Sequence, residues 1–138
     1  MVAVPLAFEQ PATAARLAHH GLAVVVENDD ITAWPTRRIR ENGIGYIPED
    51  RHRQGLLLDA PLWENRMLGH QTQAPASRRG ILTPSDARAD TERIVAEYDV
   101  RTPGIHVTVG SLSGGNQQKL IIGREMSHAP KVLIASHP

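Results

Sequence analysis

The chain has 138 residues and no formal net charge, because fifteen basic side chains balance fifteen acidic ones. This balance excludes a global field that would favour nucleic acid, so we expect no nucleic-acid partner. The lack of cysteine excludes disulfides and cysteine-based metal sites. The longest apolar runs, Leu22–Val26 and Val132–Ala135, are far shorter than the roughly 20 residues of a membrane span. We therefore expect a single soluble piece of the α/β or α+β class.

The first half of the chain predicts short elements. Proline at the start and glycine after the end favour a short helix over residues 11–20. The β-branched run at 22–27, followed by Asn-Asp-Asp, predicts a strand and then a turn. Residues 36–40 predict a short exposed helix, residues 44–47 a second strand, and residues 62–70 a further helix.

A polar segment with proline and glycine separates the two halves, and residues 71–80 are therefore predicted to form a surface loop. A helix is predicted from Thr83 to about Asp99. Thr83 is a suitable capping residue, Pro84 takes the first helical position, and an acidic residue follows in the first turn.

The C-terminal part predicts a helix followed by a strand. Ser113 is predicted to cap a helix from Gly114 to about Ser127, and Pro130 forces the chain out of it. The run at 131–135 is apolar without alternation, which is typical of a buried parallel strand.

The most informative segment is the predicted start of this last helix. Ser113 offers a hydroxyl, and Gly114 and Gly115 offer backbone N–H groups at the positive end of the helix dipole. Such an arrangement suits a phosphate, because glycine also lets an anion approach the backbone closely. The structural alternative is a serine-capped helix whose glycines only permit a tight entry. The residues alone leave both interpretations open.

Two motifs carry a resemblance to a known family. LSGGNQQK at 112–119, followed by a helix and the strand KVLIA, resembles the signature of ABC-transporter ATPase domains. GIGYIPEDRHRQGL at 43–56 is similar to the pattern GIGYxPEDRxRxGL in the second ATPase half of importers for simple sugars and nucleosides. The resemblance covers residues 28–138 and leaves 1–27 poorly matched. It implies a partial ABC-ATPase domain of the α/β, P-loop NTPase-like class, with a helical subdomain over about 55–127.

The same resemblance implies a shared ATP site, with ATP and Mg²⁺ held together with a second ABC ATPase domain. The residues that it assigns to nucleotide binding are Ser113, Gly114, Gly115, Asn116, Gln117 and Glu49. The first three would reach the γ-phosphate of ATP on the opposite domain. Asn116 replaces the glutamine that most ABC domains have. Glu49 stands where most of the family has the Q-loop glutamine, and its carboxylate can meet a metal ion or a water molecule.

Two departures from the family pattern argue against independent catalysis. The 138 residues contain no G-x-x-x-x-G-K-[ST] phosphate loop (Walker A). Ser136 and His137 stand where the family has the Walker B acid and the catalytic glutamate, and we regard these positions as degenerate. We therefore expect no catalytic residue and no ATPase activity of the chain alone. We also expect no metal site of the chain's own, because the histidines share no ligand spacing.

The function that the resemblance implies is an ATP-binding component of an ABC importer for simple sugars or nucleosides. Its expected partners are a second ABC ATPase domain and transmembrane permease subunits, and its expected location is the cytoplasmic face of the membrane. Leu62 and Trp63 are either permease-contact residues or packing residues of the helical subdomain. Two alternatives remain: a non-catalytic regulatory or binding module, and a truncated product without function.

Charged residues outside the motif allow simpler interpretations. The arginines within 37–40 are predicted to line a solvated helix face. Asp50 is expected to form a loop ion-pair network with Arg51 and Arg53. Lys119 lies near the positive end of a helix dipole, which is unfavourable and slightly favours a functional or interface role.

Overall fold

The computed structural model describes residues 25–26, 29–31 and 33–135. The helix predicted over 11–20 lies outside these residues, as do Ser136 and His137. Of the strand predicted over 22–27, the structure describes β1 (Val25–Val26), which pairs antiparallel with β2 (Asp29–Asp30). The second strand replaces part of the predicted turn.

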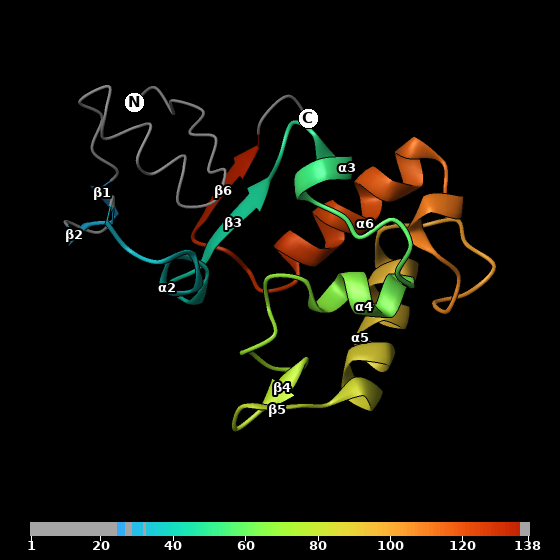
Figure 1. Cartoon of the computed structure of the whole chain (residues 1–138), viewed down its shortest axis with the longest axis horizontal. Helices are drawn as coiled ribbons and strands as arrows, with labels where there is room; N and C mark the ends of the chain where they lie inside the picture. Colours follow the sequence, from blue (N-terminus) through green and yellow to red (C-terminus); the bar gives the residue numbers. More distant parts are fainter. Residues whose placement is uncertain (1–24, 27–28, 32, 136–138) are drawn as a thin grey trace.

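A parallel pair of strands lies to the left of the helices α4, α5 and α6 in Figure 1. β3 (Ile44–Ile47) and β6 (Val132–Ala135) run side by side, as the sequence predicted for both segments. α2 (Thr36–Glu41) leads into β3 through Gly43, which has a φ of +87° and therefore favours glycine. The carbonyl oxygen of Gly43 accepts a 2.8 Å hydrogen bond from the backbone N–H of Lys131, which fixes the register.

The prediction that the last strand is buried is wrong for two of its residues. Val132 and Leu133 are each 39% exposed, whereas Ile134 is buried against Ile31, Ile39 and Ile44. Among the described residues, β6 pairs with β3 alone, so part of its apolar surface has no cover. A continuous apolar run indicates a strand that can be buried on both faces. Whether it is buried depends on the elements that pack against it, which the run itself does not reveal.

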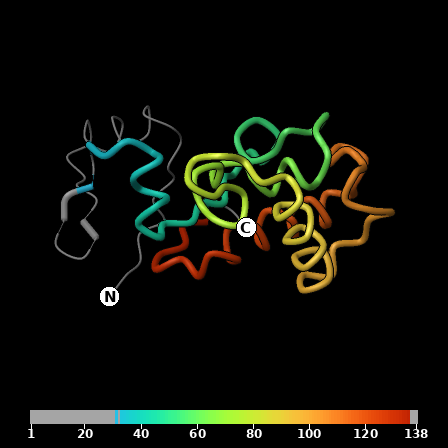
Figure 2. The backbone as a smooth tube through the Cα atoms, turned by 90° about the horizontal axis from the view of Figure 1, so that it is seen from below, coloured from blue at the N-terminus to red at the C-terminus, as the bar shows by residue number. Residues whose placement is uncertain are grey.

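The chain between β3 and β6 forms a layer of helices beside the sheet. Its elements are α3 (Arg51–Gln54), α4 (Leu62–Met67), the hairpin β4 (Ser77–Arg78) and β5 (Ile81–Leu82), α5 (Pro84–Glu97), a 3₁₀ turn η1 (Val109–Ser111) and α6 (Gly114–Met126). Figure 2 shows the helical layer with the loop near residues 100–110 at its far side from α2, which precedes β3. No helix in the described ranges has the length and apolar character needed to cross a membrane.

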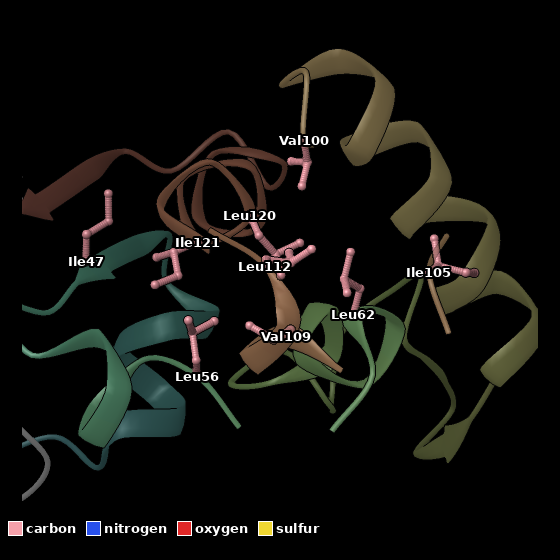
Figure 3. Packing of buried hydrophobic residues seen from close by; sticks show 9 residues of the cluster. All are labelled: Ile47, Leu56, Leu62, Val100, Ile105, Val109, Leu112, Leu120 and Ile121. Carbon is pink, nitrogen blue, oxygen red and sulfur yellow. The ribbon is translucent and has the colours of Figure 1, made fainter. Parts of the chain in front are cut away.

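The aliphatic core joins α4, α6 and the turn before α6 (Figure 3). Its buried members are Ile47, Leu56, Leu62, Val100, Ile105, Val109, Leu112, Leu120 and Ile121. Leu62 is completely buried, in agreement with the packing interpretation of this residue. Trp63 is only partly buried, and the Arg88 guanidinium lies 4.6 Å from the centre of its ring. The division into subdomains at 28, 55 and 127 stays a prediction.

The start of α5 differs in one detail from the prediction. The helix begins at Pro84, after Thr83, as expected. The Thr83 hydroxyl, however, does not cap the helix; it donates a 2.6 Å hydrogen bond to the carbonyl oxygen of Pro75. The hydroxyl therefore fastens the preceding loop, and proline at the first helical position already removes one N–H that would need a cap.

A buried ionic network centres on Glu125 of α6. Its Oε2 accepts hydrogen bonds from Arg40 Nη1 at 3.0 Å and from the Tyr46 backbone N–H at 3.1 Å, and its Oε1 accepts one from Arg124 Nε at 2.9 Å. Arg40 thus departs from the solvated face predicted for residues 37–40, because α2 packs close enough for its guanidinium to reach this carboxylate. Burial opposes the charge of Glu125, but the two arginines outweigh it and keep its pKa below the ordinary value.

The same network predicts a loss of stability in mild acid. Burial lowers the pKa of His70 to about 3, with Arg40 and His128 acting in the same direction against the attraction of Glu125. His70 therefore stays neutral when folded and takes up a proton when unfolded below about pH 6.5. Between pH 8 and pH 5 we expect this residue alone to lower the free energy of unfolding by about 2 kcal/mol.

Urea unfolding at pH 8 and pH 5 measures this change. His70→Gln is the matched variant, because it keeps a polar side chain but cannot titrate, and its stability should depend less on pH. Equal pH dependence in the two proteins would contradict the assignment of the effect to His70.

Candidate functional site

The candidate site is the first turn of α6, where the predicted phosphate-binding residues lie. Ser113 takes the N-cap position with extended backbone angles, φ −62° and ψ 153°. The prediction that its hydroxyl caps the helix is wrong, since its side chain accepts no hydrogen bond from a backbone N–H of the first turn. Ser113 Oγ instead accepts a 3.0 Å hydrogen bond from Asn116 Nδ2, which leaves its single proton for donation.

Asn116 ties the turn to the preceding loop. While its Nδ2 donates to Ser113, its Oδ1 accepts a 2.9 Å hydrogen bond from the backbone N–H of Arg101. The amide group therefore fixes the position of the serine hydroxyl relative to the segment that follows α5. It does so from a partly exposed position on the same turn.

The two glycines have different surroundings. A Cβ atom on Gly114 would lie 2.9 Å from Arg51 Nη2, so this glycine allows the guanidinium to pack against the helix. A Cβ atom on Gly115 would meet nothing within 4 Å among the described residues, and the residue lacks a positive φ. Neither packing nor backbone conformation within the described chain requires glycine at position 115. If glycine is needed at position 115, the reason is a group from another molecule that approaches this residue.

The electrostatics of this turn suit an anion. The first turn of α6 contains no acidic residue, and its N–H groups lack acceptors within the helix. The Arg51 guanidinium lies beside it, donating to Gln118 Oε1 at 3.3 Å. A cation next to the positive end of a helix is unfavourable unless a negative charge is also bound. The turn can thus donate several hydrogen bonds to a phosphate.

The remaining predicted residues lie at different depths. Gln117 is 5% exposed, and its Nε2 donates to the carbonyl oxygens of Val109 and Leu112 at 3.2 and 3.1 Å. Its side chain therefore faces the interior, not the surface that Ser113 and Gly115 share. Glu49 is exposed after the end of β3, two residues before α3 begins.

Sequence reasoning missed Arg51 and His52 as neighbours of this turn. The ion-pair network expected around Asp50 is not formed; Asp50 Oδ1 instead accepts 3.2 Å hydrogen bonds from the backbone N–H groups of His52 and Arg53 and caps α3. Arg51 and His52 are thereby directed to α6. An aspartate before a short polar segment is a helix-start signal, and it could have revealed the cap.

Lys119 has a structural partner that the sequence did not reveal. Its Nζ donates to the backbone oxygen and to Oδ2 of Asp99 at 2.7 and 2.8 Å, which ties α6 to the end of α5. The hydrogen bond from Lys119 lowers the pKa of Asp99. This contact accounts for a lysine near a helix start and removes the argument for a functional or interface role.

Comparisons with known proteins bear on this geometry. No protein-family model matches the chain. It is 47% identical over 115 residues to the guanosine import ATP-binding protein NupO of Bacillus subtilis, covering 83% of this chain and 22% of NupO. It is 41% identical over 116 residues to the nucleoside import ATP-binding protein NupA of Lactococcus lactis, covering 84% of this chain and 23% of NupA. With the ribose import ATP-binding protein RbsA 1 of Agrobacterium fabrum, it shares 44% identity over 96 residues, covering 70% of this chain and 18% of RbsA 1.

A solved structure supports the same fold. A dimeric ATP-binding cassette in a post-hydrolysis state, bound to ADP and Pi, matches with a TM-score of 0.64 and 18% identity. The match covers 91% of this chain and 57% of that one. The predicted fold class, an ABC-ATPase domain of the P-loop NTPase type, is confirmed.

Fold and sequence together place the chain in the ATP-binding cassette (ABC) family. Within it, the chain is related to a segment of the import ATP-binding proteins for nucleosides and ribose. It spans about a fifth of the length of these curated relatives.

Proposed function

We propose that this chain supplies the signature segment of an ABC import ATP-binding protein. In this proposal Ser113, Gly114 and Gly115 donate hydrogen bonds to the terminal phosphate of an ATP molecule bound mainly by a second ABC ATPase domain. The hydroxyl of Ser113 and the N–H groups of the first turn of α6 are the donors. The chain thereby contributes to hydrolysis without containing a complete site.

The surroundings of Gly115 carry the proposal. Glycine near a helix start lowers helix stability relative to alanine, and nothing among the described residues approaches its Cβ position. A phosphate group on a partner would use the space that a side chain would fill. The absence of acidic residues from the first turn and the adjacent Arg51 support the same ligand.

Glu49 offers one carboxylate for the Mg²⁺ that accompanies ATP. Carboxylates and water are the ligands that this ion prefers, and it usually binds the substrate phosphates as well. We propose that most of its ligands come from ATP and the second domain, with Glu49 acting from the edge of the composite site. The Mg²⁺ would neutralise charge that develops on the phosphates.

The importer context is proposed from the relatives. Their names describe import of guanosine, nucleosides and ribose, and we propose that this chain serves transport of the same class of solute. It would then contact transmembrane permease subunits and lie on the cytoplasmic face of the membrane. Trp63, partly exposed on α4, is the side chain that we place nearest such a contact.

The proposal predicts that the chain acts only together with a partner. Purified alone, it should not turn over ATP, because its 138 residues contain no phosphate loop to hold the nucleotide. Mixed with purified NupO, it should raise the ATPase rate in a saturable way as its concentration increases. Steady-state phosphate release measures both rates.

Two results would contradict this proposal. Multiple turnovers by the chain alone, free of contaminating ATPase, would show that it holds a complete site. A NupO rate that does not change with added chain would favour the alternatives, a non-catalytic module or a product without function.

A further inference from the structure

The side chain of Gln117 connects three separate segments. Its Nε2 donates to the carbonyl oxygens of Val109 and Leu112, in the turn that leads into α6. Its Oε1 lies 2.8 Å from His52 Nε2 and 3.5 Å from Arg51 Nε, both on α3. One buried amide therefore joins α6, the preceding turn and α3.

This geometry fixes the direction of each hydrogen bond. Carbonyl oxygens only accept, so the NH₂ group of Gln117 must face Val109 and Leu112, and its oxygen must face α3. His52 Nε2 consequently carries a proton and donates it. The bond holds in the Nε2-protonated neutral ring and in the charged ring alike.

Arg51 strengthens the same contact from outside. Its Nη1 donates to Gln118 Oε1 at 3.3 Å, and its Nη2 lies where a Cβ atom on Gly114 would come within 2.9 Å of it. α3 itself is short and depends on the Asp50 cap, directly after Glu49 in the chain. The segment 49–54 and the first turn of α6 are thus held together by side chains, although the bonded residues are 65 to 67 positions apart in the sequence.

We propose that His52 and Gln117 are positioning residues, which fix the first turn of α6 relative to the segment that contains Glu49. The inference rests on the proposed function, because the turn that they position is the one that would meet the phosphate. Gln117 then acts indirectly, through the backbone of Ser113 and Gly114. His52, whose side chain is exposed, becomes a second residue that supports the candidate site.

His52→Phe tests this inference. It keeps a ring of similar size but removes the donor, and the exposure of His52 makes a folding defect a poor explanation for any change. His52→Gln restores a donor of similar reach, and His106→Phe makes the same chemical change at an exposed histidine outside the site. Two readouts apply. The first is stimulation of the NupO ATPase. The second is hydrogen exchange of the backbone N–H of Gln117, which closes the first turn by donating a 3.0 Å hydrogen bond to the backbone carbonyl oxygen of Ser113.

We expect His52→Phe to speed exchange of the Gln117 amide and to reduce stimulation, each by about threefold to tenfold, the worth of one hydrogen bond. His52→Gln and His106→Phe should stay within about twofold of the wild type. Exchange on the isolated chain does not involve NupO, so a failure of the proposed function leaves this readout intact. Unchanged exchange in His52→Phe would overturn the inference, as would faster exchange with full stimulation.

Discussion

Replacing Glu125 with alanine is expected to lower the free energy of unfolding by about 3–5 kcal/mol. The carboxylate is 1% exposed and is the acceptor for Arg40, for Arg124 and for the Tyr46 backbone N–H. Its removal leaves the guanidinium of Arg124, which is 2% exposed, without its counter-ion. An uncompensated buried charge costs far more than a lost surface ion pair.

Urea unfolding at pH 7.5 measures this loss. Glu97→Ala is the matched control, because Glu97 forms an ion pair with Arg93 on the exposed side of α5. Such a surface pair is worth about 0–1 kcal/mol, so the control should unfold close to the wild-type denaturant concentration. Similar losses in both variants would show that the Glu125 network is not what holds α2, β3 and α6 together.

Replacing Ser113 with arginine is expected to reduce stimulation of the NupO ATPase by about tenfold to a hundredfold. The change removes the hydroxyl donor and places a long side chain where the phosphate would approach. A hydrogen bond to a charged group is worth about 1.5–3 kcal/mol, which corresponds to this range before the steric effect is added.

Two further measurements make this result interpretable. Gly115→Leu should impair stimulation similarly. Its stability should stay near the wild-type value, because none of the described residues lies within 4 Å of the Cβ position of Gly115. The urea midpoint of each variant shows whether folding is affected. Wild-type stimulation by both variants would identify the signature segment as a relic with no role in a composite site.

The sequence predicted the local elements well where the signals were themselves local. α2, β3, α5, α6 and β6 were all expected within a few residues of their observed bounds, because proline, glycine and apolar periodicity mark them. The fold class followed from two motifs. The partial exposure of β6 could not be predicted, since it depends on what packs against the strand and not on the run itself.

Side-chain partners were the weakest part of the prediction. Ser113 occupies an N-cap position, yet its hydroxyl bonds to the side chain of Asn116 three residues later and not to a backbone N–H group. The Thr83 hydroxyl bonds to the carbonyl oxygen of Pro75, eight residues earlier. Arg40 and Lys119 likewise found partners 85 and 20 residues away. Propensity describes what a residue can do within its own turn, whereas the contacts of Thr83, Arg40 and Lys119 require a neighbour that only the folded chain supplies.

The central claim is that the first turn of α6 meets the terminal phosphate of ATP held by another domain. The most direct measurement is photolabelling with ATP that carries an azidoanilide on its γ-phosphate, followed by mass spectrometry of the labelled peptides. We expect label on the peptide that contains residues 113–116 when NupO is present, and none when the chain is alone. Label on a different segment of this chain, or equal labelling of residues 113–116 without NupO, would contradict it.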